Sequence, residues 1–257
     1  MQYQAILLEI KDDIAVITLN RPDVLNALNA QIRAELLDAY KRVQTEARVV
    51  VLTGAGRAFC AGQDLGGNNV AHVDLERTLR DEYLPLLDAI YNSTIPTIHA
   101  VNGPAVGAGA NIALAADVVV ASEAANFMQA FTRIGLIPDA GGTYWLPRQI
   151  GFPRAMGAAL FAEPISARQA ADWGMIWEAV PEDTFEATWR ARAKHLAQGP
   201  TETYARVKQA LRGGMENDLL DQLELESKLQ GECGKTHDFQ EGVLAFLEKR
   251  QARFEGR

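Results

Sequence analysis

Short runs of β-branched and aliphatic residues recur along the first half of the chain and predict the strands of a buried sheet. The runs cover residues 14–19 (IAVITL), 49–53 (VVVLT), 97–101 (TIHAV) and 117–121 (DVVVA). The second and third are almost continuously apolar, as in strands that are covered on both faces. Turn residues end the first run at Asn20, Arg21 and Pro22.

Apolar positions at helical spacing predict helices between these strands. The pattern after the first strand is the clearest, with Asn29 as a possible cap and apolar positions at Leu28, Ile32, Leu36 and Tyr40. A second helix over residues 75–90 is expected to be broken or kinked at Pro85, because proline lacks the backbone N–H that a helix uses. The small residues of 112–116 predict a tightly packed helix.

The last third of the chain has a helical pattern throughout. Helices are predicted at 167–173, 185–198, 201–212, 216–230 and 238–249. Charged helices that keep an exposed apolar face pack on a neighbour more often than they stand alone, so we expect an oligomer. We therefore divide the chain into an α/β core at residues 1–197 and a helical oligomerisation region at residues 198–257.

A strand followed by a glycine-rich turn and a helix occurs twice, about 48 residues apart, which predicts an α/β sheet with ligand groups at strand ends. The turns cover residues 54–65 and 102–111. The second departs from the dinucleotide fingerprint at Ile112, and neither carries a Gly-Lys-Ser/Thr sequence. One backbone N–H from each turn would form an oxyanion hole. Close helix packing is the alternative reason for these glycines.

Asp139 is the one acidic residue between Glu123 and Glu163, and it lies in an apolar stretch at 135–142 (GLIPDAGG). A carboxylate that loses hydration has a raised pKa, which suits it to move protons at neutral pH. An aspartate that follows a proline and precedes a helix is also a common N-cap. Both interpretations stay open on the sequence, and Thr143 is an alternative cap that would free the carboxylate.

Charge and composition narrow the function classes. The formal net charge of −8 over 257 residues disfavours nucleic acid as the main partner. Cys60 and Cys233 lie far apart and form no metal-type spacing, so no metal site is expected. The N-terminus lacks the features of a signal peptide, and no apolar run reaches the roughly 18 residues of a membrane span. We expect a cytoplasmic protein that does not enter membranes.

Five motifs resemble the crotonase (enoyl-CoA hydratase/isomerase) family, in the right order and over essentially the whole chain. They are NRP at 20–22 with NAL at 26–28, AGQDL at 61–65, NGPAVGAG at 102–109, GLIPDAGGT at 135–143 and GVLAFLEKR at 242–250. The resemblance implies a spiral of ββα units followed by a helical trimerisation region, in a homotrimer or a hexamer. It also implies an acyl-CoA substrate and no metal or redox cofactor, since coenzyme A is part of the substrate.

The resemblance also assigns roles by position. It implies that Asp139 is the catalytic acid or base and that the backbone N–H groups of Gln63 and Ala108 form the oxyanion hole. The coenzyme A moiety is expected along Val24, Leu25, Ala27, Ala61, Asp64 and Leu65. Of these, Asp64 resembles a residue that stabilises its turn. The nucleotide end is expected to meet two residues of a neighbouring subunit, Phe246 and Lys249.

Relatives that add water to a double bond resemble one another in using two glutamates, and the corresponding places here hold Asn111 and Phe131. We expect both residues in the acyl-binding site, where neither can act as a base, so hydration is disfavoured. A narrower likeness, in residues 127–139, 146–148 and 173–176, is to the phenylacetate-catabolism isomerases of the family. It implies conversion of 1,2-epoxyphenylacetyl-CoA to the oxepin, a double-bond shift in an enoyl-CoA, or both.

Alternatives remain open at this point. One is an enoyl-CoA hydratase of the same family, and another is a non-catalytic acyl-CoA-binding or scaffold subunit. A hydratase of the pathway is a separate candidate partner. A dehalogenase would need a histidine, but His72 falls in a predicted loop at 66–74 and His99 is expected in the core. Core packing is likewise the alternative for four aromatic residues expected to line the acyl pocket, namely Phe131, Tyr144, Trp145 and Phe161.

Overall fold

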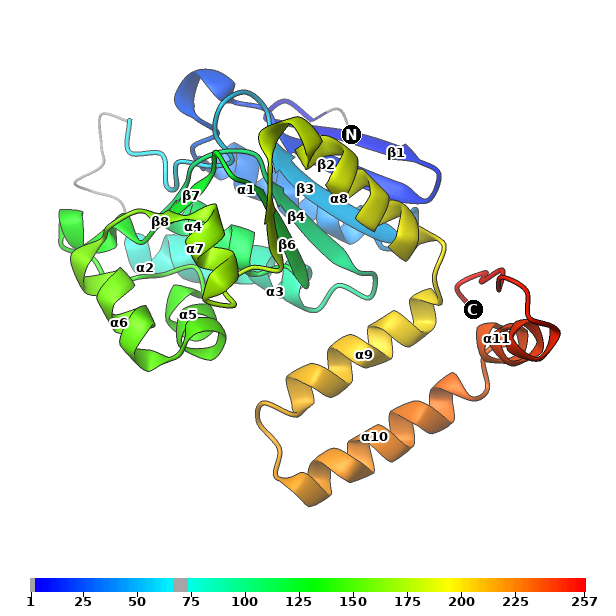
Figure 1. Ribbon diagram of the computed structural model, residues 1–257. Helices are drawn as coiled ribbons and strands as arrows, with labels where there is room; N and C mark the ends of the chain where they lie inside the picture. The colour runs from blue at the N-terminus through cyan, green and yellow to red at the C-terminus, as the bar shows by residue number, and fades with distance from the viewer. Residues whose placement is uncertain (1–2, 67–73) are drawn as a thin grey trace.

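The computed structural model describes residues 3–66 and 74–257, so most of the predicted loop at 66–74, with His72, lies outside the described residues. A six-stranded sheet in the order β1-β2-β3-β4-β6-β9 forms the centre of the chain (Figure 1). Strand β1 runs antiparallel to β2, and the other neighbours are parallel. The strands are β1 (Ile6–Lys11), β2 (Ile14–Leu19), β3 (Val49–Gly54), β4 (Thr97–Val101), β6 (Val118–Ser122) and β9 (Glu178–Val180).

A second, three-stranded sheet lies beside the first in the order β5-β7-β8. It consists of β5 (Ala105–Val106), β7 (Asn126–Met128) and β8 (Ile165–Ser166). The helices of the core are η1 (Pro22–Val24), α1 (Ala30–Val43), α2 (Leu75–Thr78), η3 (Leu79–Tyr83), α3 (Leu84–Tyr91), α4 (Ala108–Leu114), η4 (Ala130–Ile134), α5 (Gly142–Ile150), α6 (Phe152–Phe161), α7 (Ala167–Asp172) and α8 (Glu182–Ala197).

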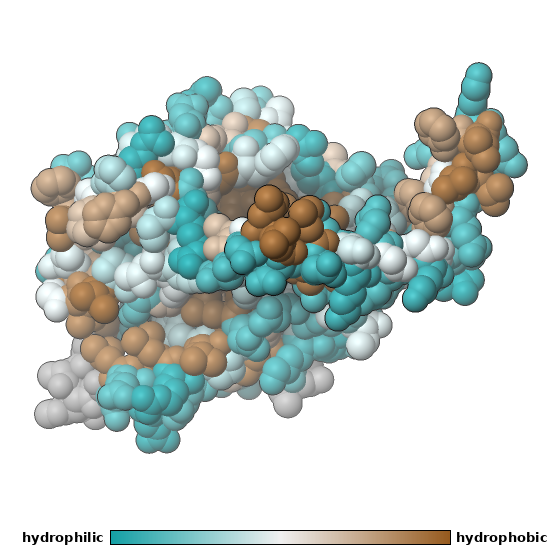
Figure 2. Space-filling view, turned by 90° about the horizontal axis from the view of Figure 1, so that it is seen from below, coloured by the Kyte–Doolittle hydropathy of each residue, from teal (hydrophilic) through white to brown (hydrophobic). Residues whose placement is uncertain are grey.

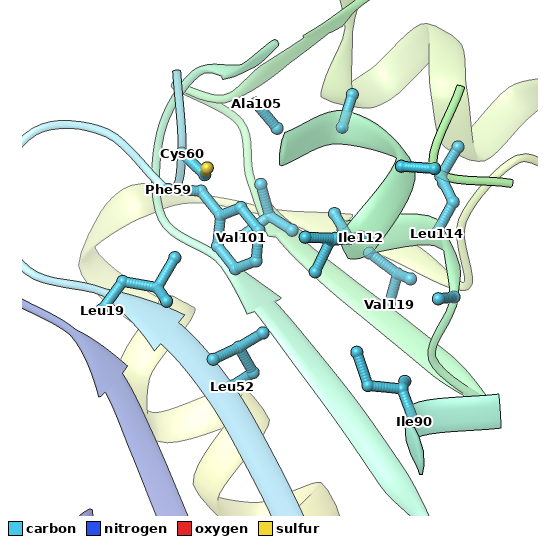
Figure 3. Close-up of a cluster of buried hydrophobic side chains, with 14 of the residues drawn as sticks. Leu19, Leu52, Phe59, Cys60, Ile90, Val101, Ala105, Ile112, Leu114 and Val119 are labelled. Atoms are coloured by element: carbon cyan, nitrogen blue, oxygen red, sulfur yellow. The ribbon is translucent and has the colours of Figure 1, made fainter. Parts of the chain in front are cut away.

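The two faces of the large sheet carry separate hydrophobic clusters, because side chains alternate along a strand. Val50 and Leu52 of β3 point to the side of α1, α3 and α4, where they join the larger cluster. Figure 3 shows part of this cluster, in which Leu52 and Phe59 lie close to side chains from α3, α4 and β4. Val49 and Val51 point the other way, against Phe185, Trp189, Ala193 and Ala197 of α8.

The longer predicted elements are confirmed, and the differences have local causes. Asn29 caps α1 by accepting a hydrogen bond from the backbone N–H of Ile32 over 3.0 Å. The expected irregularity near Pro85 is a π-helical turn, η3, which ends two residues before the proline and joins α2 to α3. Helix α4 begins at Ala108 rather than near residue 112, since Gly107 at φ +54° turns the chain straight into it.

Three C-terminal helices extend away from the body of the chain (Figure 1). They are α9 (Thr201–Gly213), α10 (Leu219–Cys233) and α11 (His237–Glu248). Asp117 ties α9 to the sheet through ion pairs of 2.7 Å with Lys208 and 2.8 Å with Arg212. The predicted division at residues 197 and 198 falls between α8 and α9, and as a domain boundary it stays a prediction.

Within residues 3–66 and 74–257, no helix combines the length and the apolar character needed to cross a membrane.

Candidate active site

The two glycine turns pack directly against each other beyond the carboxyl ends of β3 and β4. Val106 donates its backbone N–H to the carbonyl oxygen of Cys60 over 2.9 Å. Gly62 has φ +90°, and a Cβ atom there would lie 2.7 Å from the carbonyl oxygen of Val106. A Cβ atom on Gly109 would lie 2.5 Å from the carbonyl oxygen of Cys60. Only glycine permits this approach, so close packing is one reason for the glycines that the sequence shows.

The backbone N–H groups of Gln63 and Ala108 lie at this contact. Ala108 begins α4, where N–H groups have no acceptor within the helix, and a Cβ atom on Gly62 would lie 3.6 Å from its nitrogen. Gln63 forms an isolated bridge with Leu28 that leaves its own N–H unused. In the described ranges, neither N–H donates to a backbone acceptor. Two such donors can stabilise the negative charge on one carbonyl oxygen.

Asp139 lies in the turn between η4 and α5, and its carboxyl group faces an apolar surrounding. Its Oδ1 atom is buried and has no hydrogen-bond partner among residues 3–66 and 74–257. Burial raises the pKa of Asp139 from 3.8 to about 6. The carboxyl group is therefore largely ionised at neutral pH, but it can still accept and return a proton.

Asp139 is not the cap of the helix that follows it. The N-cap residue of α5 is Gly141, at φ +82°, and in the part of the chain that the structure describes no side chain caps this helix end. The alternative that Thr143 supplies the cap is therefore excluded within the described residues as well. The carboxylate makes no capping bond to α5, and its Oδ1 atom has no partner among the described residues, so that atom is available for other chemistry.

A cavity of about 650 Å³ opens beside Asp139. One wall comes from the continuous run of α2, η3 and α3, and the other comes from the turn and first residues of α5. The lining residues are mainly apolar and include Leu79, Tyr83, Leu87, Tyr91, Leu136, Ile137, Tyr144 and Trp145. A cavity of this size, apolar except for a few polar groups, is suited to a small acyl group.

The four aromatic residues predicted for the acyl pocket divide into two groups. Tyr144 and Trp145 line the cavity, in contact with each other at a ring-centroid distance of 4.9 Å. Phe161 is 72% exposed at the end of α6 and does not line it, so that prediction is wrong. Phe131 is buried beside Gly107, where it packs against the second glycine turn rather than lining the cavity.

Asn111 was expected to contact the acyl group, and the structure corrects this. Its side chain is fully buried on α4, one turn after Ala108. The Nδ2 atom donates to the backbone carbonyl oxygen of Asp139 over 2.7 Å, and Oδ1 accepts from Nε2 of Gln129 over 2.7 Å. Asn111 therefore contacts the backbone of the candidate base and has no surface that a substrate could reach.

The residues expected along coenzyme A come from two segments that pair with each other. Residues 24–28 and 61–65 are joined by backbone hydrogen bonds of 2.8 to 3.1 Å. Val24 and Leu65 are 44% and 48% exposed on these segments, whereas Ala27 is nearly buried. The structure thus brings Val24, Leu25, Ala27, Ala61, Asp64 and Leu65 together, and their contact with coenzyme A stays a prediction.

Asp64 stabilises its own turn, as expected. Its Oδ1 atom accepts from the backbone N–H of Gly66 over 3.0 Å, and Oδ2 forms an ion pair of 2.9 Å with Arg21. The N–H of Gly66 first, and the guanidinium group of Arg21 second, lower the pKa of Asp64. This carboxylate is already occupied, in contrast to that of Asp139.

His99 is a core residue, as predicted. It is fully buried, its Nδ1 donates to the carbonyl oxygen of Ala113 over 3.1 Å, and its Nε2 lies 2.7 Å from the hydroxyl of Tyr40. Burial lowers the pKa of His99 to about 4, so the ring is neutral. Phe246 and Lys249 lie on and just after α11, and their predicted role at a neighbouring subunit stays a prediction.

Tyr83 is a site residue that the sequence did not reveal. It lines the cavity, and its hydroxyl donates to Oε1 of Gln63 over 2.6 Å, while NH1 of Arg33 donates to the same oxygen over 2.9 Å. These bonds hold the side chain of one predicted oxyanion-hole residue against the cavity wall. Helical spacing marks the apolar positions around Tyr83, but no local pattern indicates its contact with a residue twenty positions earlier.

Comparison with known proteins extends over the whole chain. A family model described as enoyl-CoA hydratase/isomerase matches residues 9–257. A Rhodobacter capsulatus protein named "probable enoyl-CoA hydratase" is 61% identical over 100% of both chains. The 1,2-epoxyphenylacetyl-CoA isomerase of Escherichia coli K12 is 44% identical over 98% of both. The crystal structure of an enoyl-CoA hydratase from Bacillus anthracis is similar at a TM-score of 0.92 and 32% identity, covering 99% of this chain and 100% of the other. The predicted fold class is confirmed.

Proposed function

The chain belongs to the enoyl-CoA hydratase/isomerase (crotonase) family, and within it we propose an acyl-CoA isomerase that uses Asp139 as its one base. The observation that carries the proposal is the carboxylate itself. Its Oδ1 atom is buried and has no partner among the described residues, and Asp139 lines an apolar cavity. A single base of this kind suits the transfer of a proton between two carbon atoms.

The proposed reaction moves a proton from one carbon atom of the substrate to another, so the substrate neither gains nor loses atoms. Asp139 takes the proton from the carbon next to the thioester, and the electron pair of that C–H bond moves into a bond to the carbonyl carbon. The thioester oxygen takes the negative charge and is held by the N–H groups of Gln63 and Ala108. The carboxylic acid then returns the proton to the carbon two positions further along an unsaturated chain, and the double bond shifts.

Two observations support an aryl or unsaturated acyl group as the substrate. The cavity of about 650 Å³ is walled by aromatic and aliphatic side chains. The E. coli relative at 44% identity is named for a reaction on 1,2-epoxyphenylacetyl-CoA. The proposed substrates are accordingly 1,2-epoxyphenylacetyl-CoA, which would be converted to the oxepin, and 3-enoyl-CoA thioesters in phenylacetate degradation.

Hydration is the second candidate function, because the R. capsulatus relative at 61% identity carries the name of a hydratase. Against it, Asn111 and Phe131 occupy the places in which water-adding relatives resemble one another in keeping glutamates. Neither side chain can activate water. The third candidate, a non-catalytic binding subunit, required Asp139 to be buried against its helix cap and inaccessible to ligand, but the N-cap position of α5 is Gly141 and Asp139 lines the cavity.

Hydrogen exchange tests the proposal. Wild-type protein is incubated with trans-3-hexenoyl-CoA or phenylacetyl-CoA in heavy water, and NMR follows exchange at the carbon next to the thioester. We expect exchange in the wild type and its loss in Asp139→Asn, which keeps the shape of the side chain. Asp88→Asn is the matched control, since Asp88 lines the same cavity but already accepts a hydrogen bond from Asn92 over 2.7 Å.

Two results would overturn the isomerase. Exchange that survives Asp139→Asn would remove the base from the mechanism. The addition of water to trans-2-hexenoyl-CoA is measured by the loss of absorbance of the conjugated thioester. A hydration rate higher than the rate of the double-bond shift would favour the hydratase.

The proposed enzyme works as a homotrimer or as a pair of trimers. Large apolar side chains on α10 and α11 are 69% to 82% exposed, namely Leu219, Leu220, Phe246 and Leu247. Figure 2 shows brown side chains gathered on the helices that project from the body. Exposed apolar surface of this kind is typical of an interface. Light scattering after size exclusion tests this proposal, and a monomer at micromolar concentration would contradict it. A hydratase partner stays a prediction.

A further inference from the structure

We infer that Asn111 and Gln129 form a buried amide pair that positions Asp139 through its backbone, and that this pair sets the direction of the catalytic carboxylate. The inference rests on the proposed function, since it assigns Asn111 and Gln129 to the service of the base in that mechanism. Neither residue touches the substrate cavity, so both are positioning residues.

The carboxyl group of Asp139 has no anchor of its own on Oδ1. That atom is buried and lacks a partner in the described residues, which is what a base needs if its lone pairs are to stay free. With no hydrogen bond on Oδ1 among the described residues, the direction of the carboxylate depends on the backbone that carries it and on the packing around it. The orientation of the peptide group of Asp139 therefore matters more here than at an aspartate whose carboxylate is itself held.

The backbone at this point adopts a conformation that needs support. Ala140, the next residue, has φ +47°, in a region that residues other than glycine rarely adopt, and Gly141 follows at φ +82°. Strain of this kind persists where the surrounding structure holds it. The carbonyl oxygen of Asp139 accepts two hydrogen bonds, one from the backbone N–H of Gly142 over 2.9 Å and one from Nδ2 of Asn111 over 2.7 Å.

Asn111 is itself held in place from two sides. Its Oδ1 accepts from Nε2 of Gln129 over 2.7 Å, and the two side chains are fully buried. A Cβ atom on Gly142 would collide with the amide group of Asn111, so the amide lies directly against the turn. Asn111 is on the same short helix as Ala108, one turn further along. Helix α4 thus carries one predicted oxyanion-hole N–H and the tether of the base together.

This arrangement also explains the role of Asn111, which stands where water-adding relatives keep a glutamate. The amide of Asn111 donates to a carbonyl oxygen, and an ionised carboxylate cannot donate. The position is thus committed to holding the turn of Asp139, and it is closed to solvent. The amide in place of a glutamate suits an isomerase that depends on one carboxylate, because it fixes the orientation of that base.

The test is the double variant Asn111→Leu/Gln129→Met, which removes both amides at similar volume and leaves no buried amide without its partner. Steady-state kinetics with trans-3-hexenoyl-CoA are measured over the acid range of pH. We expect kcat to fall by about 10- to 100-fold with KM little changed, because a small misplacement of a catalytic group affects the chemical step more than binding. We also expect the acid limb of kcat/KM to move to lower pH, since a released turn lets water reach the carboxyl group of Asp139.

The pH readout separates positioning from simple stability. The other titratable groups that line the cavity are Asp88, Tyr83, Tyr91 and Tyr144, so the two aspartates are the only carboxylic acids among the lining residues. Asp88→Asn identifies any contribution of the second aspartate to the limb. Ser93→Ala is the structural control, because it removes a buried hydrogen bond of 2.8 Å to the carbonyl oxygen of Ile95, and it should lower Tm without moving the limb.

Three results are informative. If Asp139→Asn retains activity, the proposed function fails, and the inference fails with it. If Asp139→Asn is inactive while the double variant keeps its kcat and its acid limb, the positioning role alone is overturned. If the double variant does not fold, Asn111→Leu and Gln129→Met are measured singly, and an unchanged kcat and limb in both would equally overturn the inference.

Discussion

The partly buried carboxylate of Asp139 should make the protein less stable as the pH rises, and Asp139→Asn should remove this effect. Burial raises the pKa of Asp139 in the folded protein to about 6, compared with an ordinary value of 3.8. A folded-state pKa that is raised contributes stability below the ordinary pKa, and the contribution is lost as the pH rises through the folded-state value. The loss therefore falls between about pH 4 and pH 6.

The size of the effect follows from the two pKa values. Their difference corresponds to about 3 kcal/mol, at about 1.4 kcal/mol for each pH unit. The carboxyl group lies in an open cavity and keeps some contact with water, so we reduce this to about 1–2 kcal/mol. For a chain of this length, the corresponding change in Tm is about 2–8 °C.

Thermal unfolding of the wild type and Asp139→Asn is compared from about pH 4.5 to pH 8. The Tm of Asp139→Asn should rise relative to that of the wild type as the pH rises, whatever the difference between the two is at about pH 4.5. Asp64→Asn provides a control without pH dependence in this range, because the N–H of Gly66 and the guanidinium of Arg21 lower the pKa of Asp64. Its stabilising contribution is fully present above the ordinary pKa of an aspartate, so the Tm of that variant should lie below that of the wild type by a constant amount. Parallel curves for Asp139→Asn would refute the argument from desolvation.

Three further substitutions test the turn, the cavity wall and the first helix. Gly141→Ala should lower the free energy of unfolding by about 1–3 kcal/mol, because φ is +82° and a Cβ atom would lie 2.7 Å from Cε2 of Trp145. Calorimetry measures this loss, and an unchanged Tm would contradict it. Tyr83→Phe should lower kcat and reduce the free energy of unfolding by about 0.5–1.5 kcal/mol, because it removes the 2.6 Å hydrogen bond to Gln63. A wild-type kcat in this variant would argue against a role of Tyr83 in holding Gln63. Asn29→Ala should cost about 1 kcal/mol in urea unfolding and leave kcat unchanged.

The parts of the fold that local pattern could predict were the long elements. The helix after the first strand, including its Asn29 cap, and the strands β2, β3, β4 and β6 follow directly from periodicity. The short strands β5, β7, β8 and β9 were missed, because two or three residues are too few to show a period. They pair only because other parts of the chain bring their partners to them.

The candidate site divides in the same way. The motifs singled out Asp139, the two glycine turns and the segments at 24–28 and 61–65, since each is a local sequence feature, whereas the pairing of the two segments came from the structure. The exposed Phe161 and the buried Asn111 were placed wrongly, because residue type does not specify which way a side chain points in the folded chain.

The sequence by itself determined the family, the strands β2, β3, β4 and β6, most of the longer helices, and the presence of one acid in an apolar stretch. Only the tertiary structure decided that Asp139 is free rather than a helix cap, since the turn places Gly141 at that position. It also decided that Asn111 and Tyr83 support the site through contacts with residues 28 and 20 positions away. Local periodicity reflects which residues are buried, but hydrogen bonds between distant segments depend on the packing of the whole chain.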